Sequence, residues 1–250
     1  MKTSHKNVSI IIITFNEEDN ILKILQDLKR QSFKNFEIIV SDSNSSDNTE
    51  KNARTMMSQF SEFRFENCSE TLGPSHGRNF GVTFAKYERL LFLDADTRIH
   101  DIHFLRKFMS ITNRLKIEAG SMYPRLSTKH LMPKIGYKLM NAGFFITQYF
   151  SPTACGSCMF STKTMHKSIG GFSEDVFLCE DCDYVRNGKK HGFKTKMAPL
   201  HFEFSDRRLQ QDGFLRTGAK YLTANVIRFV TGKSVNKRRL EYKFGHYLKK

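Results

Sequence analysis

The feature of this sequence that most restricts its fold is an alternation, from residue 8 to about residue 96, of short apolar runs with polar loops and amphipathic segments. The runs Val8–Thr14 and Phe36–Val40 are mostly apolar, and Leu90–Leu93 is apolar without a break, as in strands that are buried on both faces. The segments between them carry apolar residues at helical spacing, as in Ile21, Ile24, Leu25 and Leu28. Strands that alternate with helices in this way predict the α/β class, with a mostly parallel sheet flanked by helices.

Two aspartates, Asp94 and Asp96, follow directly on the last of these runs and are separated by Ala95. Open α/β sheets bind their ligands just beyond the carboxyl ends of the strands. Side chains at positions i and i+2 of an extended segment point to the same side, so both carboxylates can converge on one ligand. This pair therefore predicts a site for Mg²⁺ or Mn²⁺ that also holds phosphate. An acidic surface turn is the alternative that the motif alone leaves open.

After residue 100 the pattern is less regular, and it predicts a mixed sheet that completes the same domain. A strand is expected over Gly156–Ser161, a helix over Asp181–His191 and a final strand over Thr195–His201. The stretch Leu139–Phe150 is dense in Phe, Met and Ile, and fits either a core segment or a membrane-facing lip.

The charge of the chain favours anionic partners. Forty basic residues against twenty-five acidic ones give a net charge of +15, which suits sugar nucleotides, lipid phosphates, membrane surfaces or nucleic acid. Much of the excess lies after residue 232, where Glu241 is the only acidic residue. Residues 206–250 are therefore expected to form a basic amphipathic helical tail, which either contacts an anionic membrane or docks on the core.

Length and hydropathy restrict the location. The 250 residues are 39% hydrophobic, enough for one large domain with a sizeable core. No apolar stretch reaches the length that spans a bilayer, and the run Val8–Ile13 is too short for a secretory signal. We therefore expect a cytoplasmic protein with possible peripheral contact at the inner face of the membrane.

The cysteines support a rival hypothesis. Cys155 and Cys158 form one C-x2-C pair, and Cys179 and Cys182 form a second one twenty residues later. This spacing is typical of a four-cysteine zinc site, although reduced thiols in a reducing compartment are the alternative. With its basic residues and aromatics, the chain could then be a zinc-binding nucleic-acid module. That hypothesis leaves the acidic motifs unexplained, since carboxylates repel phosphate, and we therefore expect no nucleic-acid partner.

Several motifs, taken together and in order, resemble the family 2 glycosyltransferases of the Rossmann-like GT-A fold over about residues 8–205. The resemblance divides residues 1–205 into a nucleotide-binding half, about 8–96, and an acceptor-binding half, about 97–205, with the tail 206–250 outside it. The segments that carry it are Val8–Glu17, Glu37–Asp42 with Ser46–Thr49, Gly73–Gly81, Leu93–Asp96, Gly170–Phe172 and Glu180–Arg186.

The resemblance implies the transfer of a sugar, with inversion, from a nucleoside diphosphate sugar to an acceptor hydroxyl. The acceptor is a saccharide or a lipid-linked molecule such as a polyprenyl phosphate. On the donor side, Asp42 is expected to bind the nucleobase and Arg78 the base or the diphosphate. Thr14, Asn16 and Glu17 are expected to bind the nucleoside.

The remaining roles concern the reaction itself. The resemblance implies that Asp94 faces the ribose or the metal, and that Asp96 and His201 are metal ligands. Asp181 is the expected general base, since an inverting reaction needs a carboxylate on the acceptor side, and Glu180 is expected to orient the acceptor. One departure is Asn44, which stands where the family often has glycine. The donor nucleotide is left open.

Overall fold

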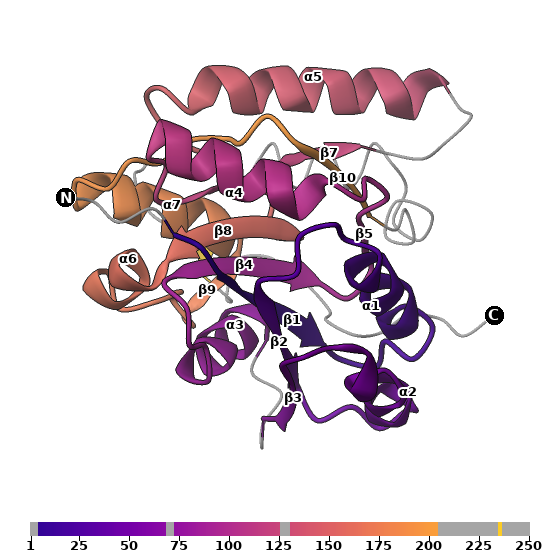
Figure 1. Ribbon diagram of the computed structural model, residues 1–250. Helices are drawn as coiled ribbons and strands as arrows, with labels where there is room; N and C mark the ends of the chain where they lie inside the picture. The colour runs from indigo at the N-terminus through magenta and orange to yellow at the C-terminus, as the bar shows by residue number, and fades with distance from the viewer. Residues whose placement is uncertain (1–4, 69–72, 126–130, 205–234, 237–250) are drawn as a thin grey trace.

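The computed structural model describes residues 5–68, 73–125, 131–204 and 235–236 (Figure 1). The helices are α1 (Ile21–Lys29), α2 (Thr49–Thr55), α3 (Pro74–Thr83), α4 (Phe104–Leu115), α5 (Leu131–Thr147), α6 (Lys163–Ser168) and α7 (Glu180–Lys190), with a 3-10 turn at Met57–Gln59. The strands are β1 (Val8–Thr14), β2 (Phe36–Asp42), β3 (Phe63–Asn67), β4 (Arg89–Asp94), β5 (Thr97–Arg98), β6 (Gly120–Ser121), β7 (Tyr123–Arg125), β8 (Cys158–Thr162), β9 (Val176–Leu178), β10 (His201–Phe204) and β11 (Val235–Asn236).

A six-stranded sheet in the order β3-β2-β1-β4-β8-β6 forms the centre of the fold. Strands β1 to β4 are mutually parallel, whereas β8 runs antiparallel to both β4 and β6. Two small sheets, β5-β10-β7 and β11-β9, accompany it. The prediction of a parallel first half and a mixed second half is therefore confirmed.

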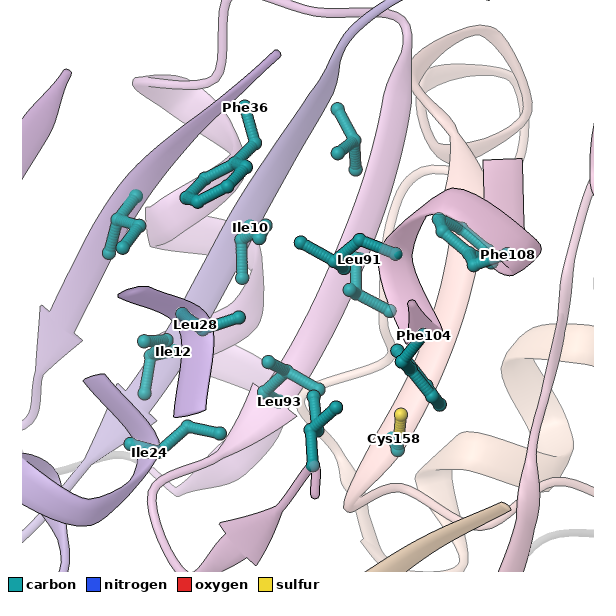
Figure 2. Packing of buried hydrophobic residues seen from close by; sticks show 14 of the residues in the cluster. Ile10, Ile12, Ile24, Leu28, Phe36, Leu91, Leu93, Phe104, Phe108 and Cys158 are labelled. Atoms are coloured by element: carbon teal, nitrogen blue, oxygen red, sulfur yellow. The ribbon is translucent and has the colours of Figure 1, made fainter. Parts of the chain in front are cut away.

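Helices cover both faces of this sheet, because its central strands are apolar on both sides. On one face Ile10, Ile12, Leu91 and Leu93 pack against α1 and α4, as Figure 2 shows with Ile24, Leu28, Phe104 and Phe108. On the other face Ile11 and Phe92 pack against Val82 of α3, Met165 of α6 and Tyr184 of α7. Each fully buried Ile, Leu or Phe contributes about 1.5–3 kcal/mol. The two layers together hold the strand ends in a fixed register.

The expected strand at Gly156–Ser161 is found as β8 and the expected helix at Asp181–His191 as α7, each within two residues. The final strand was placed wrongly, since β10 begins at His201, where the expected strand ends. Residues 195–200 instead run as an irregular segment that hydrogen-bonds to Ala119 and Ser121. Their apolar side chains, among them Met197 and Ala198, are buried there, so the hydrophobicity of the segment reflects burial rather than strand structure.

The predicted tail lies outside the described residues, except for β11, which pairs antiparallel with β9. Its helical character and the domain boundary at residue 205 therefore stay predictions. Within the described part of the chain, no helix has the length and apolar content that a membrane crossing requires.

Candidate active site

Three polar residues end three neighbouring strands of the sheet. In the strand register, Thr14 of β1 is the partner of Asp42 of β2, and Ile13 is the partner of Asp94 of β4. Because neighbouring strands lie about 4.8 Å apart, Asp42, Thr14 and Asp94 stand at one edge of the sheet. This is the carboxyl edge, where the sequence predicted them to gather.

Asp42 is buried at this edge, and its carboxylate accepts three hydrogen bonds from protein groups. Its Oδ1 accepts hydrogen bonds from Thr14 Oγ1 and Ser45 Oγ, both at 2.6 Å, and its Oδ2 accepts one from Ser45 N at 2.7 Å. A carboxylate offers about four acceptor positions. The predicted contact between Asp42 and a nucleobase therefore stays a prediction, and it would have to use the acceptor position that these three bonds leave.

The loops after β1 and β2 are tied together by Asn16. Its backbone N donates to Ser45 Oγ at 2.8 Å, and its Oδ1 accepts from Ser46 N at 2.9 Å. Asn16 has φ 54° and Asn44 has φ 61°, the left-handed region in which Asn is among the few side chains tolerated. Residue 44 thus has the left-handed backbone conformation that favours glycine, and Asn can replace glycine there because it tolerates this conformation.

Glu17 has a structural part in the same loop. It is buried, its Oε2 accepts from Asn20 Nδ2 at 2.7 Å, and its backbone N donates to Thr49 Oγ1 at 2.8 Å. Its carbonyl also accepts from the backbone N of Asn20 and of Ile21, at the start of α1. Glu17 thus joins the beginnings of α1 and α2, and its predicted contact with a nucleoside is not tested by these bonds.

The segment after β4 has the alternation that its sequence predicted. Asp94 and Asp96 are half-buried, whereas Ala95 between them is buried in the core. Asp94 N and Thr97 Oγ1 both donate to the carbonyl of Ser157, at 3.1 and 2.7 Å, and so fix the turn. Two partly exposed carboxylates at i and i+2 are donors that suit Mg²⁺ or Mn²⁺, with substrate and water as the other ligands. The residues present therefore fit a divalent cation.

Arg78 of α3 connects the two halves of the site. Its side chain is 2% exposed; Nη1 donates to Glu180 Oε1 at 2.8 Å, and Nη2 donates to Asp94 Oδ1 at 3.1 Å and to the Gly156 carbonyl at 3.3 Å. Its guanidinium lies 5.4 Å from the centre of the Phe172 ring. Desolvation by burial lowers the pKa of Arg78, but the Asp94 and Glu180 carboxylates outweigh it and raise that pKa. Arg78 therefore remains a buried cation that holds two acidic side chains.

Asp181 lies beside this cation. A Cβ atom placed on Gly156 would be 3.0 Å from Arg78 Nη2 and 3.3 Å from Asp181 Oδ2, so both side chains flank the same point. Asp181 belongs to the first turn of α7, where the helix dipole favours the ionised carboxylate. The residue before the helix, Cys179, has φ 60°, a strained conformation for a side chain of this type. The structure thus brings residue 181 to the edge that contains Asp94.

His201 stands apart from this group. It begins β10, is exposed, and its ring centre is 6.0 Å from that of Tyr123. Partial desolvation of its ring lowers the pKa of His201, and the positive charge of Arg125 lowers that pKa further. No group of three or more His, Cys, Asp or Glu that could hold a metal occurs within the described residues, so Asp94, Asp96 and His201 do not form one ligand set in this structure. The metal role of His201 stays a prediction.

The loop that contains Gly170–Phe172 is held against α3 by Asn79, a residue whose role the sequence did not indicate. Asn79 Nδ2 donates to the Phe172 carbonyl at 2.9 Å and to Glu174 Oε1 at 2.8 Å, and Asn79 Oδ1 accepts from Phe172 N at 2.9 Å. His76 Nδ1 lies 3.1 Å from Glu174 Oε2. The ring of Phe172 stacks on Tyr184 of α7 with centres 3.9 Å apart. No short-range signal could have paired these residues, since they are separated by more than ninety positions.

The four-cysteine zinc site of the rival hypothesis is not formed. All five cysteines, each within the described residues, are thiols rather than disulfides. Cys158 Sγ lies 3.6 Å from Met122 Sδ in the core, and Cys182 Sγ donates to the Ala154 carbonyl at 3.5 Å. Burial raises the pKa of the Cys155 thiol to about 12 and that of Cys158 as well. No group of three or more His, Cys, Asp or Glu that could hold a metal occurs in the part of the chain that the structure describes, so these four cysteines do not form a zinc site there.

Comparison with known proteins decides the family. The Glycosyl transferase family 2 model matches residues 9–169, which is more than half of the chain. The chain belongs to glycosyl transferase family 2. Membership of family 2 places it among the glycosyltransferases, and the sequence-based resemblance is confirmed.

Curated relatives share limited identity with this family 2 chain. It is 26% identical over 219 residues, 84% of its length and 56% of the relative's, to a 4,4'-diaponeurosporenoate glycosyltransferase of Staphylococcus haemolyticus. It is 34% identical over 93 residues, 37% of its length, to a GalNAc(5)-diNAcBac-PP-undecaprenol beta-1,3-glucosyltransferase of Campylobacter jejuni, of which it covers 30%. The chain spans about half the length, or less, of the curated relatives it matches.

Solved structures confirm the GT-A fold. The mannosyltransferase PcManGT from Pyrobaculum calidifontis, in complex with GDP-Man and Mn²⁺, gives a TM-score of 0.73 at 18% identity, over 94% of this chain and 67% of that one. S. aureus TarS 1-349 in complex with UDP-GlcNAc gives 0.62 at 16% identity, over 79% of this chain and 58% of that one. At this identity the likeness concerns the fold alone.

Proposed function

We propose that this domain transfers a sugar, with inversion at the anomeric carbon, from a nucleoside diphosphate sugar to an acceptor hydroxyl in glycan or glycolipid assembly. The observation that carries the proposal is the meeting of Asp94 and Glu180 on the buried guanidinium of Arg78, with Asp181 beside it. The strand ends supply the acidic groups on the donor side, and the first turn of α7 supplies those on the acceptor side.

In the proposed reaction Asp181 is the general base. Its Oδ1 accepts from Cys182 N at 2.7 Å, which fixes the carboxylate, while its Oδ2 lies on the side of Gly156. As the acceptor oxygen forms its bond to the anomeric carbon, Asp181 takes the proton of the hydroxyl. The bond from that carbon to the diphosphate oxygen breaks, and its electron pair leaves with the nucleoside diphosphate. Glu180, held by Arg78, orients the acceptor.

The donor is held at the strand ends. Asp94 and Asp96 would bind a divalent cation, Mn²⁺ or Mg²⁺, and this cation would supply Lewis-acid stabilisation of the charge on the leaving diphosphate. Thr14, Asn16, Glu17 and Asp42 would receive the nucleoside. In support, Thr14 donates to Asp42, Asn16 N donates to Ser45 Oγ and Glu17 N donates to Thr49 Oγ1, so the loops after β1 and β2 are held together. Arg78 contributes mainly by fixing the two acidic groups, since it is almost fully buried.

The proposed acceptor is lipid-linked. Relatives from Campylobacter jejuni and Escherichia coli are named for undecaprenol-bound substrates, and the relative from Staphylococcus haemolyticus for a 4,4'-diaponeurosporenoate. A lipid-linked acceptor, together with the net charge of +15, leads us to propose peripheral contact with the anionic inner face of a membrane.

The test is the loss of donor turnover in two variants that should still fold. Asp96→Ala and Asp181→Asn are each expected to reduce sugar transfer or donor hydrolysis at least 100-fold, because each removes a charge that acts on the reacting atoms. Asp19→Ala and Asp175→Asn are matched controls, since both carboxylates are exposed. Thermal unfolding would confirm that all four variants fold. Full activity of both site variants would refute the assignment.

The donor can be identified with the same protein. A panel of nucleoside diphosphate sugars is added with and without Mn²⁺, and the melting temperature is recorded. A ligand that binds only the folded chain raises this temperature by mass action. The expected result is a shift that requires both Mn²⁺ and the matching nucleotide, and that is lost in Asp96→Ala.

A further inference from the structure

We infer that the outer face of helix α5 is a docking surface for an anionic lipid bilayer. We call this surface the α5 face, and it consists of Ile135, Leu139, Met140, Phe145 and Ile146 of α5 together with Tyr149 and Phe150, which follow directly after the helix. Their exposed fractions range from 37% for Met140 to 69% for Leu139. The nine large apolar side chains that are exposed in the described residues include these seven. Such a concentration marks an interaction surface, whereas single exposed apolar residues are ordinary.

The helix is oriented by its opposite side, which faces the protein. Tyr137 and Gln148 are buried, and Asn141 Nδ2 donates to the Pro124 carbonyl of β7 at 3.0 Å. These positions recur at the spacing of one helix stripe. At 3.6 residues per turn, Leu139 and Ile146 stand roughly opposite that stripe. Figure 1 shows α5 along the outer edge of the molecule, beyond β7 and β10. An apolar outer stripe is the reverse of what a helix surrounded by water normally presents.

The charge around the α5 face selects a bilayer with acidic headgroups. No Asp or Glu occurs from residue 119 to residue 173. Lys134 and Lys138 are exposed on α5 itself. Just beyond the end of the helix, Lys189 Nζ donates to the Tyr149 carbonyl at 2.6 Å, and Lys196 Nζ lies 5.9 Å from the centre of the Tyr149 ring.

Aliphatic side chains flanked by Lys and Tyr are typical of segments that lie in the interface of a bilayer, with the apolar part in the acyl region and the ammonium groups among phosphates. A protein partner would have to match these lysines with acids of its own, whereas a bilayer with anionic lipid offers many negative groups without any fixed geometry. The bilayer is therefore the occupant that these residues fit.

The position of the α5 face relative to Asp181 suggests what membrane docking would do, and this step rests on the proposed function. Lys189, which holds the end of the α5 face, belongs to α7, and the same helix begins with Glu180 and Asp181. The rise of an α-helix separates Asp181 from Lys189 by about 12 Å. A chain docked through α5 would thus place its acceptor-side carboxylates within reach of a headgroup-borne hydroxyl at the membrane surface.

The test uses the full chain and vesicles of defined composition. Wild-type protein is sedimented with neutral phosphatidylcholine vesicles and with vesicles that contain about 30% phosphatidylglycerol, a proportion that approximates an anionic leaflet. The expected result is preferential binding to the anionic vesicles, weakened by salt. The double variant Leu139→Glu with Ile146→Glu should lower this binding at least tenfold. Ile102→Glu is the matched control, because Ile102 is 49% exposed on another part of the surface, and it should bind as the wild type does.

Three outcomes would overturn the inference. Unchanged vesicle binding by the double variant would place the lipid contact elsewhere in the chain. Equal binding to neutral and anionic vesicles would remove the role of the lysines. The third outcome combines two measurements: the wild type binds no vesicles, and light scattering shows a wild-type dimer but a monomeric double variant. The α5 face would then be a contact between two copies of the chain. Donor hydrolysis without vesicles should be equal in wild type and double variant; if the wild type shows none, the proposed function fails while the vesicle result still stands.

Discussion

Removal of the positive charge of Arg78, which lies between Asp94 and Glu180, is the sharpest test of how the two halves of the site are held together. Arg78→Met replaces the buried guanidinium by an apolar side chain of similar length. Asp94 and Glu180 then lose their charge partner, and water cannot fully replace it because their side chains are only 30% and 12% exposed. The variant is therefore expected to leave two partly buried carboxylates close together without compensation.

The magnitude follows from the burial of the three groups. Breaking a fully buried ion pair by removing one partner costs about 3–5 kcal/mol. Because Asp94 retains some access to water, we expect the lower end of that range, about 3 kcal/mol. Adding Glu180→Gln to Arg78→Met removes one of the two stranded charges and should restore about 1 kcal/mol. The double variant should therefore be more stable than Arg78→Met alone, whereas two independent destabilising substitutions would add their costs.

Urea unfolding of the wild type, Arg78→Met, Glu180→Gln and the double variant measures these free energies directly. Arg64→Met is the matched control, since Arg64 is 48% exposed and its nearest acidic oxygen, on Glu66, is 3.9 Å away; it should change the free energy of unfolding by less than about 0.5 kcal/mol. The reasoning fails if Arg78→Met costs no more than this control, or if Glu180→Gln adds to its damage.

Three further predictions concern packing, pH and metal. Gly81→Ala should lower the free energy of unfolding by about 1–3 kcal/mol, because the added Cβ would lie 2.5 Å from Ile11 Cγ2. Gly143→Ala is the control: a Cβ added there has no atom within 4 Å, so this variant should be neutral or stabilising in urea unfolding. Burial raises the pKa of Asp27, but hydrogen bonds from Arg98 and the backbone of Ile99 lower it more, so its net pKa is depressed. The stability that Asp27 contributes above about pH 4 should therefore be lost as the pH falls further. In urea unfolding over a pH series, Asp27→Asn should be less stable than the wild type at neutral pH, and this difference should disappear at low pH. Chelation of divalent cations should abolish sugar transfer and Mn²⁺ should restore it, which a transfer assay with added chelator measures.

Much of the fold could be predicted from the sequence, because the signals that define it are local. The mostly apolar run Val8–Thr14 and the unbroken apolar run Leu90–Leu93 belong to strands buried on both faces, the central strands β1 and β4. Polar residues at strand ends had to meet at one edge, since parallel strands all point the same way. The same logic failed for residues 195–200, where apolar side chains are buried without forming a strand.

Other features were decided by tertiary structure alone. The sequence indicated a contact of Arg78 with the donor, but the fold buries its guanidinium between Asp94 and Glu180, a residue more than a hundred positions away. Gly156, which the sequence analysis named only as the start of an expected strand, has no side chain where Arg78 and Asp181 approach each other. Likewise, the density of Phe, Met and Ile in 139–150 could not distinguish core from surface, because only the direction in which α5 packs determines which stripe meets water.

The class of the fold, its family and the edge at which acidic groups gather therefore follow from local sequence patterns, since periodicity and strand direction are properties of neighbouring residues. Which of those groups share one buried cation, and which apolar side chains remain outside, was decided by the packing of segments far apart in the chain. That information resides in distances between elements, and no local pattern contains it.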